Sequence, residues 1–127
     1  MLGSKKSLPV TMDAMGAKIQ EAEWGDMHVS FESYRERFDV TPLLKGLPND
    51  LDPCPHWGYV LKGEYRVKYR DGREEVYRTG DAYYSAPGHT SILEAGSESV
   101  EFSPKELMKK TMDVIGRNLE AVNKAKR

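Results

Sequence analysis

The sequence predicts an all-β protein, a barrel or sandwich of antiparallel strands followed by one α-helix, and three observations support this. Short alternating segments recur roughly every ten residues with glycine or proline between them. Asp71-Gly72, the preferred dipeptide of a tight hairpin turn, stands between two such segments. After Ser103 the apolar period lengthens to three or four residues, which is typical of a helix. The chain has 127 residues, a length that suits one domain.

The first part of the chain is expected to be a loose arm followed by the barrel. Residues 1–15 contain glycine and proline and are expected to form the arm, and residues 16–103 are expected to form the barrel. Met27, Val29 and Phe31 alternate with polar residues, which predicts a half-buried strand.

The middle of the chain carries a proline-rich interruption. Four prolines lie between residues 39 and 55, so this segment is expected to be a loop or a short helical turn rather than a central strand. Further strands are expected at residues 57–61, 65–69, 74–78, 82–86, 91–94 and 100–102.

Residues 104–127 are expected to form the C-terminal helix. Ser103 can cap it, Pro104 suits its first position, and Glu106 completes a capping box. The helix carries an apolar stripe made of Met108, Met112, Ile115, Leu119 and Val122. The stripe is expected to pack on the outside of the barrel, and a homodimer formed through it is the alternative.

Composition excludes some classes of function. The 19 basic and 20 acidic residues nearly balance, which disfavours nucleic-acid binding. The sequence contains neither a membrane-length apolar run nor a secretory leader pattern, and its single cysteine allows no intrachain disulfide. A cytoplasmic protein without nucleic-acid or membrane partners is therefore expected.

Two sequence blocks carry a family resemblance. They are Cys54-Pro-His-Trp-Gly-Tyr-Val-Leu-Lys-Gly63 and Gly80-Asp-Ala-Tyr-Tyr-Ser-Ala-Pro-Gly-His-Thr90. Their glycines, proline and apolar strand end resemble the two signature motifs of the cupin superfamily, over about residues 26–102. The chain looks most like the small single-domain bacterial cupins with altered metal-ligand motifs. This resemblance implies a double-stranded β-helix, or jelly-roll barrel, with the helix outside it.

The resemblance also locates the positions where cupins carry metal ligands. The glutamate of the first motif falls on His56, and its two histidines fall on Asp50 and Asp52. The histidine of the second motif falls on Ser91, with His89 two residues before it, near the mouth of the barrel. Asp52, His56 and His89 are therefore the candidate ligands for a divalent first-row metal. A buried histidine that only hydrogen-bonds its neighbours is the competing interpretation.

The strand that begins near His56 supplies further candidates for ligand binding. Cys54 is two residues before His56, so both side chains are expected on one face. Its thiol is either a soft ligand or nucleophile, or a small buried residue. Tyr59 and Leu61 are expected to line the cavity beside His56, while Trp57 points away and packs on the second sheet or the helix.

Three functions are compatible with these residues. The preferred one is a cupin-fold protein that binds a small organic ligand in its barrel, with no assignable chemistry or catalytic residue. The alternative is a metal-dependent cupin enzyme, a dioxygenase, isomerase or lyase, that uses His56 and His89. The third, implied by the sugar epimerases of the superfamily, is a metal-free enzyme with His56 as general base and a tyrosine as acid. The preferred and alternative functions both predict that His56 and His89 converge on one cavity. The orientation of Glu101 stays open.

Overall fold

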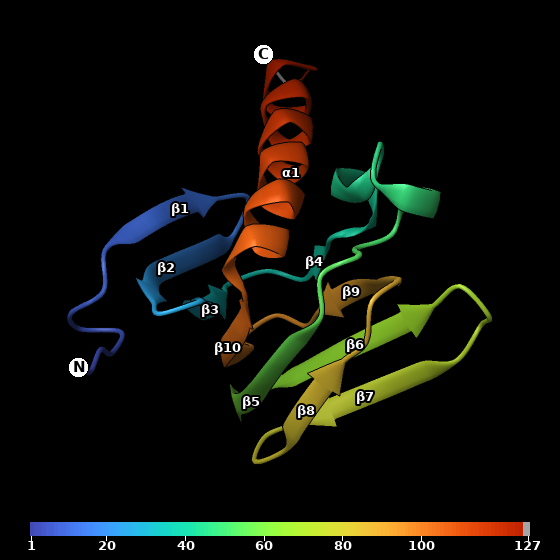
Figure 1. Cartoon of the computed structure of the whole chain (residues 1–127). Coiled ribbons are helices and arrows are strands. Elements are labelled where there is room, and N and C mark those ends of the chain that lie inside the picture. The colour runs from blue at the N-terminus through green and yellow to red at the C-terminus, as the bar shows by residue number, and fades with distance from the viewer. Residues whose placement is uncertain (126–127) are drawn as a thin grey trace.

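The computed structural model describes residues 1–125, which form two antiparallel sheets and a C-terminal helix (Figure 1). The six-stranded sheet has the order β1 (Val10–Ala14), β2 (Ala17–Trp24), β3 (Met27–Tyr34), β10 (Glu98–Pro104), β5 (His56–Lys62) and β8 (Ala82–Ser85). The four-stranded sheet has the order β4 (Phe38–Asp39), β9 (His89–Leu93), β6 (Glu64–Tyr69) and β7 (Glu74–Arg78).

The predicted fold class is confirmed. Every pairing between these strands is antiparallel, and the last strand, β10, lies between β3 and β5 in the middle of the larger sheet. The predicted hairpin joins β6 to β7, and Gly72 occupies its turn with a φ of 92°, a conformation that favours glycine. The proline-rich segment forms two 3-10 turns, η1 (Thr41–Leu44) and η2 (Pro48–Asp50).

Two local predictions need correction. The segment expected to be a loose arm contains β1, which pairs with β2 through a register that includes a bulge. Ser103 was expected to cap the helix, but it lies in β10 with its hydroxyl 2.7 Å from His56 Nδ1. The side chain is drawn inward because β10 alternates and Ser103 falls on the face that looks into the barrel.

Helix α1 (Lys105–Ala125) covers one end of the barrel (Figure 1). It packs against η1, β10 and β3, and Met108, Met112 and Ile115 of the predicted stripe reach the interior cavity. The stripe therefore faces the barrel. Residues 126 and 127 of the expected helix lie outside the described residues. No helix within residues 1–125 combines the length and the apolar character needed to cross a membrane.

Strand β3 presents its polar face to the interior. His28 and Ser30 are buried, and Ser30 and Glu32 line the cavity, whereas Val29 and Phe31 lie on the opposite face. The apolar residues of this strand therefore lie on the outer face of the sheet, because its inner face borders the polar side of the interior cavity.

Candidate functional site

The interior cavity lies between the two sheets, beneath α1, and has a volume of about 90 Å³. One part is apolar and is lined by Met12, Ala17, Ile19, Phe38, Val40, Leu43, Leu93, Met108, Met112 and Ile115. The other part is polar and is lined by Glu21, Ser30, Glu32, Tyr34, Asp52, His56, Tyr65, Ser91 and Glu101. A cavity with an apolar wall and a few convergent polar groups is the usual form of a small-molecule site.

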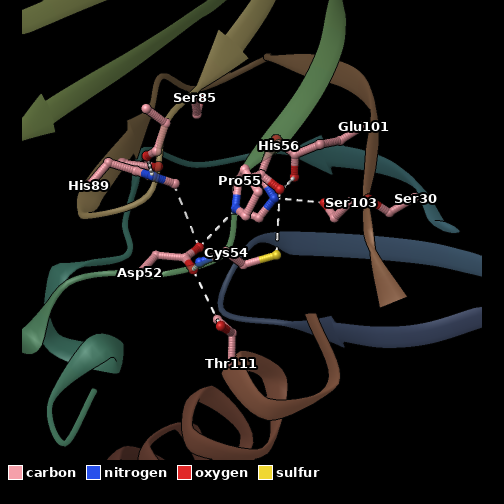
Figure 2. Close-up of polar contacts among 12 residues, drawn as sticks. Ser30, Asp52, Cys54, Pro55, His56, Ser85, His89, Glu101, Ser103 and Thr111 are labelled. Atoms are coloured by element: carbon pink, nitrogen blue, oxygen red, sulfur yellow. Dashed lines mark hydrogen bonds and ion pairs between the residues drawn. The ribbon is translucent and has the colours of Figure 1, made fainter. Parts of the chain in front are cut away.

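A buried group of Asp52, His56 and His89 stands at the polar side (Figure 2). One ligand atom from each residue lies within 4.8 Å of the other two, and the imidazole rings are 5.1 Å apart, edge to face. His56 opens β5 and His89 opens β9. The backbone holds the group together because Asp52 N–H donates to the carbonyl of His89 over 2.8 Å.

The Asp52 carboxylate is the hub of this group. Its Oδ1 accepts from the Cys54 backbone N–H at 2.8 Å and from Thr111 Oγ1 of α1 at 3.3 Å. Its Oδ2 accepts from His56 Nε2 at 2.8 Å. Burial favours the neutral acid, but the hydrogen bond and the charge of His56 outweigh it and lower the pKa of Asp52. The carboxylate is therefore ionised at neutral pH.

His56 lies between two acids. Nε2 contacts Asp52, while Nδ1 lies 2.7 Å from Ser103 Oγ and 3.7 Å from Glu101 Oε2. Burial opposes the imidazolium, yet the negative charge of Glu101 and the hydrogen bond to Asp52 hold the pKa of His56 well above its usual value. Without a bound cation, His56 is the positive charge that balances these carboxylates.

His89 is oriented differently. Its Nδ1 donates to the carbonyl of Ala86 over 2.6 Å, because a carbonyl oxygen can only accept. Burial lowers the pKa of His89, which keeps the ring neutral and leaves a lone pair on Nε2. That nitrogen is buried, has no hydrogen-bond partner, and lies 3.6 Å from Asp52 Oδ2. His89 therefore directs an unused electron-pair donor at the Asp52 carboxylate.

A second pair of acids, Glu32 and Glu101, lies on neighbouring strands of the same cavity. Glu32 accepts from Tyr34 Oη at 2.6 Å and from Ser30 Oγ at 2.8 Å, and Glu101 accepts from Tyr83 Oη at 2.8 Å. Burial and the charge of Glu101 raise the pKa of Glu32 to about 8. Glu32 is half-buried and lines the cavity.

The rings of His56 and His89 lie edge to face, but His56 lines the interior cavity and His89 is not among the residues that line it, so their convergence on one cavity stays a prediction. Asp52 joins them, but Asp50 is exposed and accepts from the Gly46 N–H instead. Ser91, at the position of the second-motif histidine, lines the cavity and lies 3.1 Å from Tyr65 Oη. The buried group therefore takes its acid, Asp52, from the proline-rich segment before the first block and its second histidine, His89, from the first position of β9.

The expected orientation of Tyr59 and Leu61 is wrong. They are 45% and 40% exposed and share the outer face of β5 with Trp57, because an odd separation from His56 reverses the side of a strand. Gly58 and Val60 follow His56 on the inner face. Trp57 does point away from His56, as expected, but it packs on Tyr84 of β8 with ring centroids 5.1 Å apart.

Cys54 is fully buried beside the group. Its thiol lies 3.5 Å from the carbonyl oxygen of Pro55, a weak hydrogen bond. The group of potential ligand atoms within the described residues does not include its sulfur. The geometry supports the small buried residue among the two interpretations of Cys54.

Three site residues were missed in the sequence: Glu32, Ser103 and Thr111. Glu101 points inward, which resolves its orientation. Alternation within β10 could have linked Glu101 to Ser103 on one face, but nothing in the sequence places Thr111 of α1 beside Asp52. That contact depends on how the helix docks.

No protein-family model and no curated protein sequence matches the chain. Solved structures do match. An RmlC-like cupin from Shewanella frigidimarina has a TM-score of 0.57 and 16% identity, over 80% of this chain and 88% of that one. The polyketide cyclase RemF from Streptomyces resistomycificus has a TM-score of 0.58 and 12% identity, over 82% and 78%.

A third similar structure is described as FeII HppE, with a TM-score of 0.53 and 11% identity over 81% of this chain and 59% of that one. At such identities the similarity concerns the path of the backbone. The structural similarity agrees with the strand order, with the two glycine-bearing blocks and with the position of the buried group. This chain has the cupin fold.

Proposed function

We propose that the protein binds a small organic ligand in its interior cavity, with Asp52 and His56 on its polar side and His89 in contact with His56 behind them. The observation that carries this proposal is the polarity of the cavity, which is apolar beneath α1 and polar toward β3, β5 and β10. Such a site holds the body of a ligand by burial and fixes its orientation by hydrogen bonds.

A variant that fills the cavity tests this proposal. Met112→Trp places a larger side chain on the wall, and Leu107→Trp makes the same class of change at an exposed position of the same helix. A panel of small polar compounds is screened by ligand-observed NMR. We expect compounds that bind wild type and Leu107→Trp to lose binding to Met112→Trp. Equal binding to all three proteins would place the ligand elsewhere.

A metal-dependent function is the second candidate, and the free Nε2 of His89 favours it. Two imidazoles and one carboxylate are a common donor set for a first-row divalent metal. His89 donates its other ring nitrogen to the Ala86 carbonyl, and His56 Nδ1 lies beside Ser103 Oγ and Glu101. Such partners orient metal-binding histidines. These residues fit a metal.

Asp52, His56 and His89 would hold such a metal, and the metal would supply a Lewis acid beside the cavity. Binding requires neutral imidazoles, so His56 would give up the proton that it shares with Asp52. Glu101 and Ser103 would then orient its ring through Nδ1. The similarity to a structure described as FeII HppE supports this candidate at the level of the fold.

Elemental analysis of protein purified without a chelating tag tests this candidate. We expect a stoichiometric first-row metal in wild type, its loss in His89→Ala, and its retention in His28→Ala, a buried histidine outside the group. Chelator should lower the melting temperature of wild type and leave that of His89→Ala unchanged. Metal content that survives His89→Ala would exclude this site.

A second copy of the chain is the partner that we propose. The outer face of β10, β5 and β8 carries a continuous uncharged patch, the outer aromatic patch, made of Val100, Phe102, Trp57, Tyr59, Leu61, Ala82 and Tyr84. Strand register places Phe102 beside Trp57 and Trp57 beside Tyr84.

Area and shape both favour a second copy. Five of these side chains are 36–47% exposed, which at roughly 200 Å² per large side chain leaves on the order of 400 Å² of apolar surface. That is about half of what one partner buries in a standard interface of about 800 Å² per side, so a dimer of this size would also bury parts of the neighbouring strands. A sheet face can pack on its own copy about a two-fold axis, which makes one patch sufficient.

A further inference from the structure

The cavity has an unbalanced set of charged and hydrogen-bonding groups. Four of its lining residues carry carboxyl groups: Glu21, Glu32, Asp52 and Glu101. Among the described residues that line it, none is lysine or arginine, and His56 is the one basic group. His56 is already shared between Asp52 and Glu101. We propose, on the basis of the ligand-binding function above, that the cavity selects a small amine whose ammonium group binds at Glu32 and Glu101.

The hydrogen-bond inventory of the two glutamates supports a cationic donor. An ionised carboxylate offers about four acceptor positions, whereas Glu32, whose pKa of about 8 keeps it protonated at neutral pH, offers fewer and carries an O–H donor. The protein supplies three donors to them, from Tyr34, Ser30 and Tyr83. Several acceptor positions remain for a ligand, and an ammonium brings three N–H donors on one atom.

Ser99 provides an independent observation beside this pair. It lies directly opposite Glu32 in the β3–β10 register, so both side chains are on the inner face. It is 4% exposed, and its hydroxyl has no hydrogen-bond partner. A buried hydroxyl without a partner costs free energy in the absence of ligand. Ser99 is not among the residues that line the cavity, but its register position beside Glu32 puts its oxygen within reach of a donor bound to Glu32.

The apolar wall of the cavity determines the size and polarity of the part of the ligand that lies away from the ammonium group. Met108, Met112 and Ile115 face the cavity from α1, and Ile19 and Phe38 face it from the sheets. A volume of about 90 Å³ suits a short alkyl chain rather than a large ring system. A carboxylate of the same size would bring a negative charge toward Glu101 and Asp52, which would repel it. The chemistry therefore favours a short-chain amine and excludes a matching acid.

A series of matched probes tests this selection. Wild-type protein is titrated with n-butylamine, n-butanol and butyrate at neutral pH and constant ionic strength, and amide shifts are followed by NMR. We expect butylammonium to perturb residues of β3, β10 and α1 and to bind at least about tenfold more tightly than butyrate or butanol, as a charge-assisted contact requires.

Variants assign the binding to the pair. Glu101→Gln and Glu32→Gln should each weaken butylammonium binding about tenfold or more and leave butanol unaffected. Glu94→Gln, at a glutamate on the surface near β9, should change neither. If one glutamine variant does not fold, the other variant and the wild-type series still decide the question.

The outcomes separate this inference from the proposed function. Tighter or equal binding of butyrate or butanol would overturn selection of an amine and leave a ligand-binding cavity. Binding of butylammonium unaffected in both glutamine variants would overturn the assignment to Glu32 and Glu101. Failure of all three probes to bind in the cavity would contradict both the inference and the proposed function.

Discussion

Tyr83 reaches Glu101 by crossing over Gly58. Strand register aligns Glu101 of β10, Gly58 of β5 and Tyr83 of β8 in one row on the inner face. Because Gly58 has no side chain, the phenol passes over it and donates to Glu101 Oε1 at 2.8 Å. A Cβ at Gly58 would meet the Tyr83 ring and hydroxyl and would lie 2.6 Å from the carbonyl oxygen of Val100.

Gly58→Ala should therefore be strongly destabilising. The new methyl group meets backbone as well as Tyr83, and Tyr83 can yield only by losing its hydrogen bond to the buried Glu101. We expect a loss of about 2–4 kcal/mol in the free energy of unfolding, measured by urea denaturation. Gly116→Ala is the matched control, since a Cβ there meets nothing within 4 Å; it should stabilise the helix by roughly 0.5–1 kcal/mol. Equal effects of the two changes would contradict the close approach at Gly58.

The proton on Glu32 should make stability depend on pH. Burial and Glu101 raise the pKa of this carboxyl from 4.5 to about 8 on folding, so the folded state holds the proton more tightly than the unfolded chain. The contribution of this proton to the free energy of unfolding is complete below about pH 4.5 and is lost as the pH rises through about 8. Glu32→Gln removes this titration, so the stability of the variant relative to wild type should increase as the pH rises from about 4.5 to about 8. Glu23→Gln, at an exposed position, should follow wild type in the same thermal melts.

These residues also show how far sequence reasoning reached. Strand spacing and the hairpin at Gly72 predicted the barrel, and alternation placed His56 inside and Trp57 outside. Tyr59 and Leu61 were predicted on the inner face, although they are three and five residues after His56 and alternation places them on the outer face. The two-residue period of a strand shows which side chains share a face. It does not show which of the two faces is buried.

Glu32 was not predicted as a site residue, and the reason is physical. Its strand alternates apolar and polar residues, and burial of the apolar set is the usual outcome. Here Ser30 and Glu32 face a polar cavity, while Val29 is 1% exposed on the other side of the sheet. Part of this outer face is covered by the N-terminal segment, where Gln20 Nε2 donates to the carbonyls of Lys5 and Leu8. Contacts between segments that are distant in sequence decide which face of β3 borders the cavity. The alternation of residues within one strand does not reveal these contacts.

Asn118 should contribute to the docking of α1. Its side-chain amide donates to the carbonyls of Leu43 at 2.7 Å and Lys45 at 2.8 Å, which ties the helix to η1 beside the cavity. Asn118→Ala leaves the carbonyl of the buried Leu43 without this donor, so we expect a loss of about 1–3 kcal/mol in thermal or chemical denaturation. Hydrogen exchange of α1 should also become faster. Arg117→Ala, at the neighbouring exposed position, should alter stability by less than about 0.5 kcal/mol.

The outer aromatic patch should mediate self-association. Tyr59 is 45% exposed on β5 and lies opposite Val100 of β10. Tyr59→Lys places a charge inside the proposed interface, where its desolvation would cost more than a surface site does. Analytical ultracentrifugation should show a dimer for wild type and at least a tenfold weaker association for Tyr59→Lys. Thr79→Lys, an exposed change on the turn after β7, should dimerise as wild type does. Because Tyr59 points away from the cavity, the variant should keep its ligand and metal binding, which would separate assembly from the site. A wild-type protein that stays monomeric at high concentration would contradict the interface, as would a Tyr59→Lys dimer of unchanged affinity.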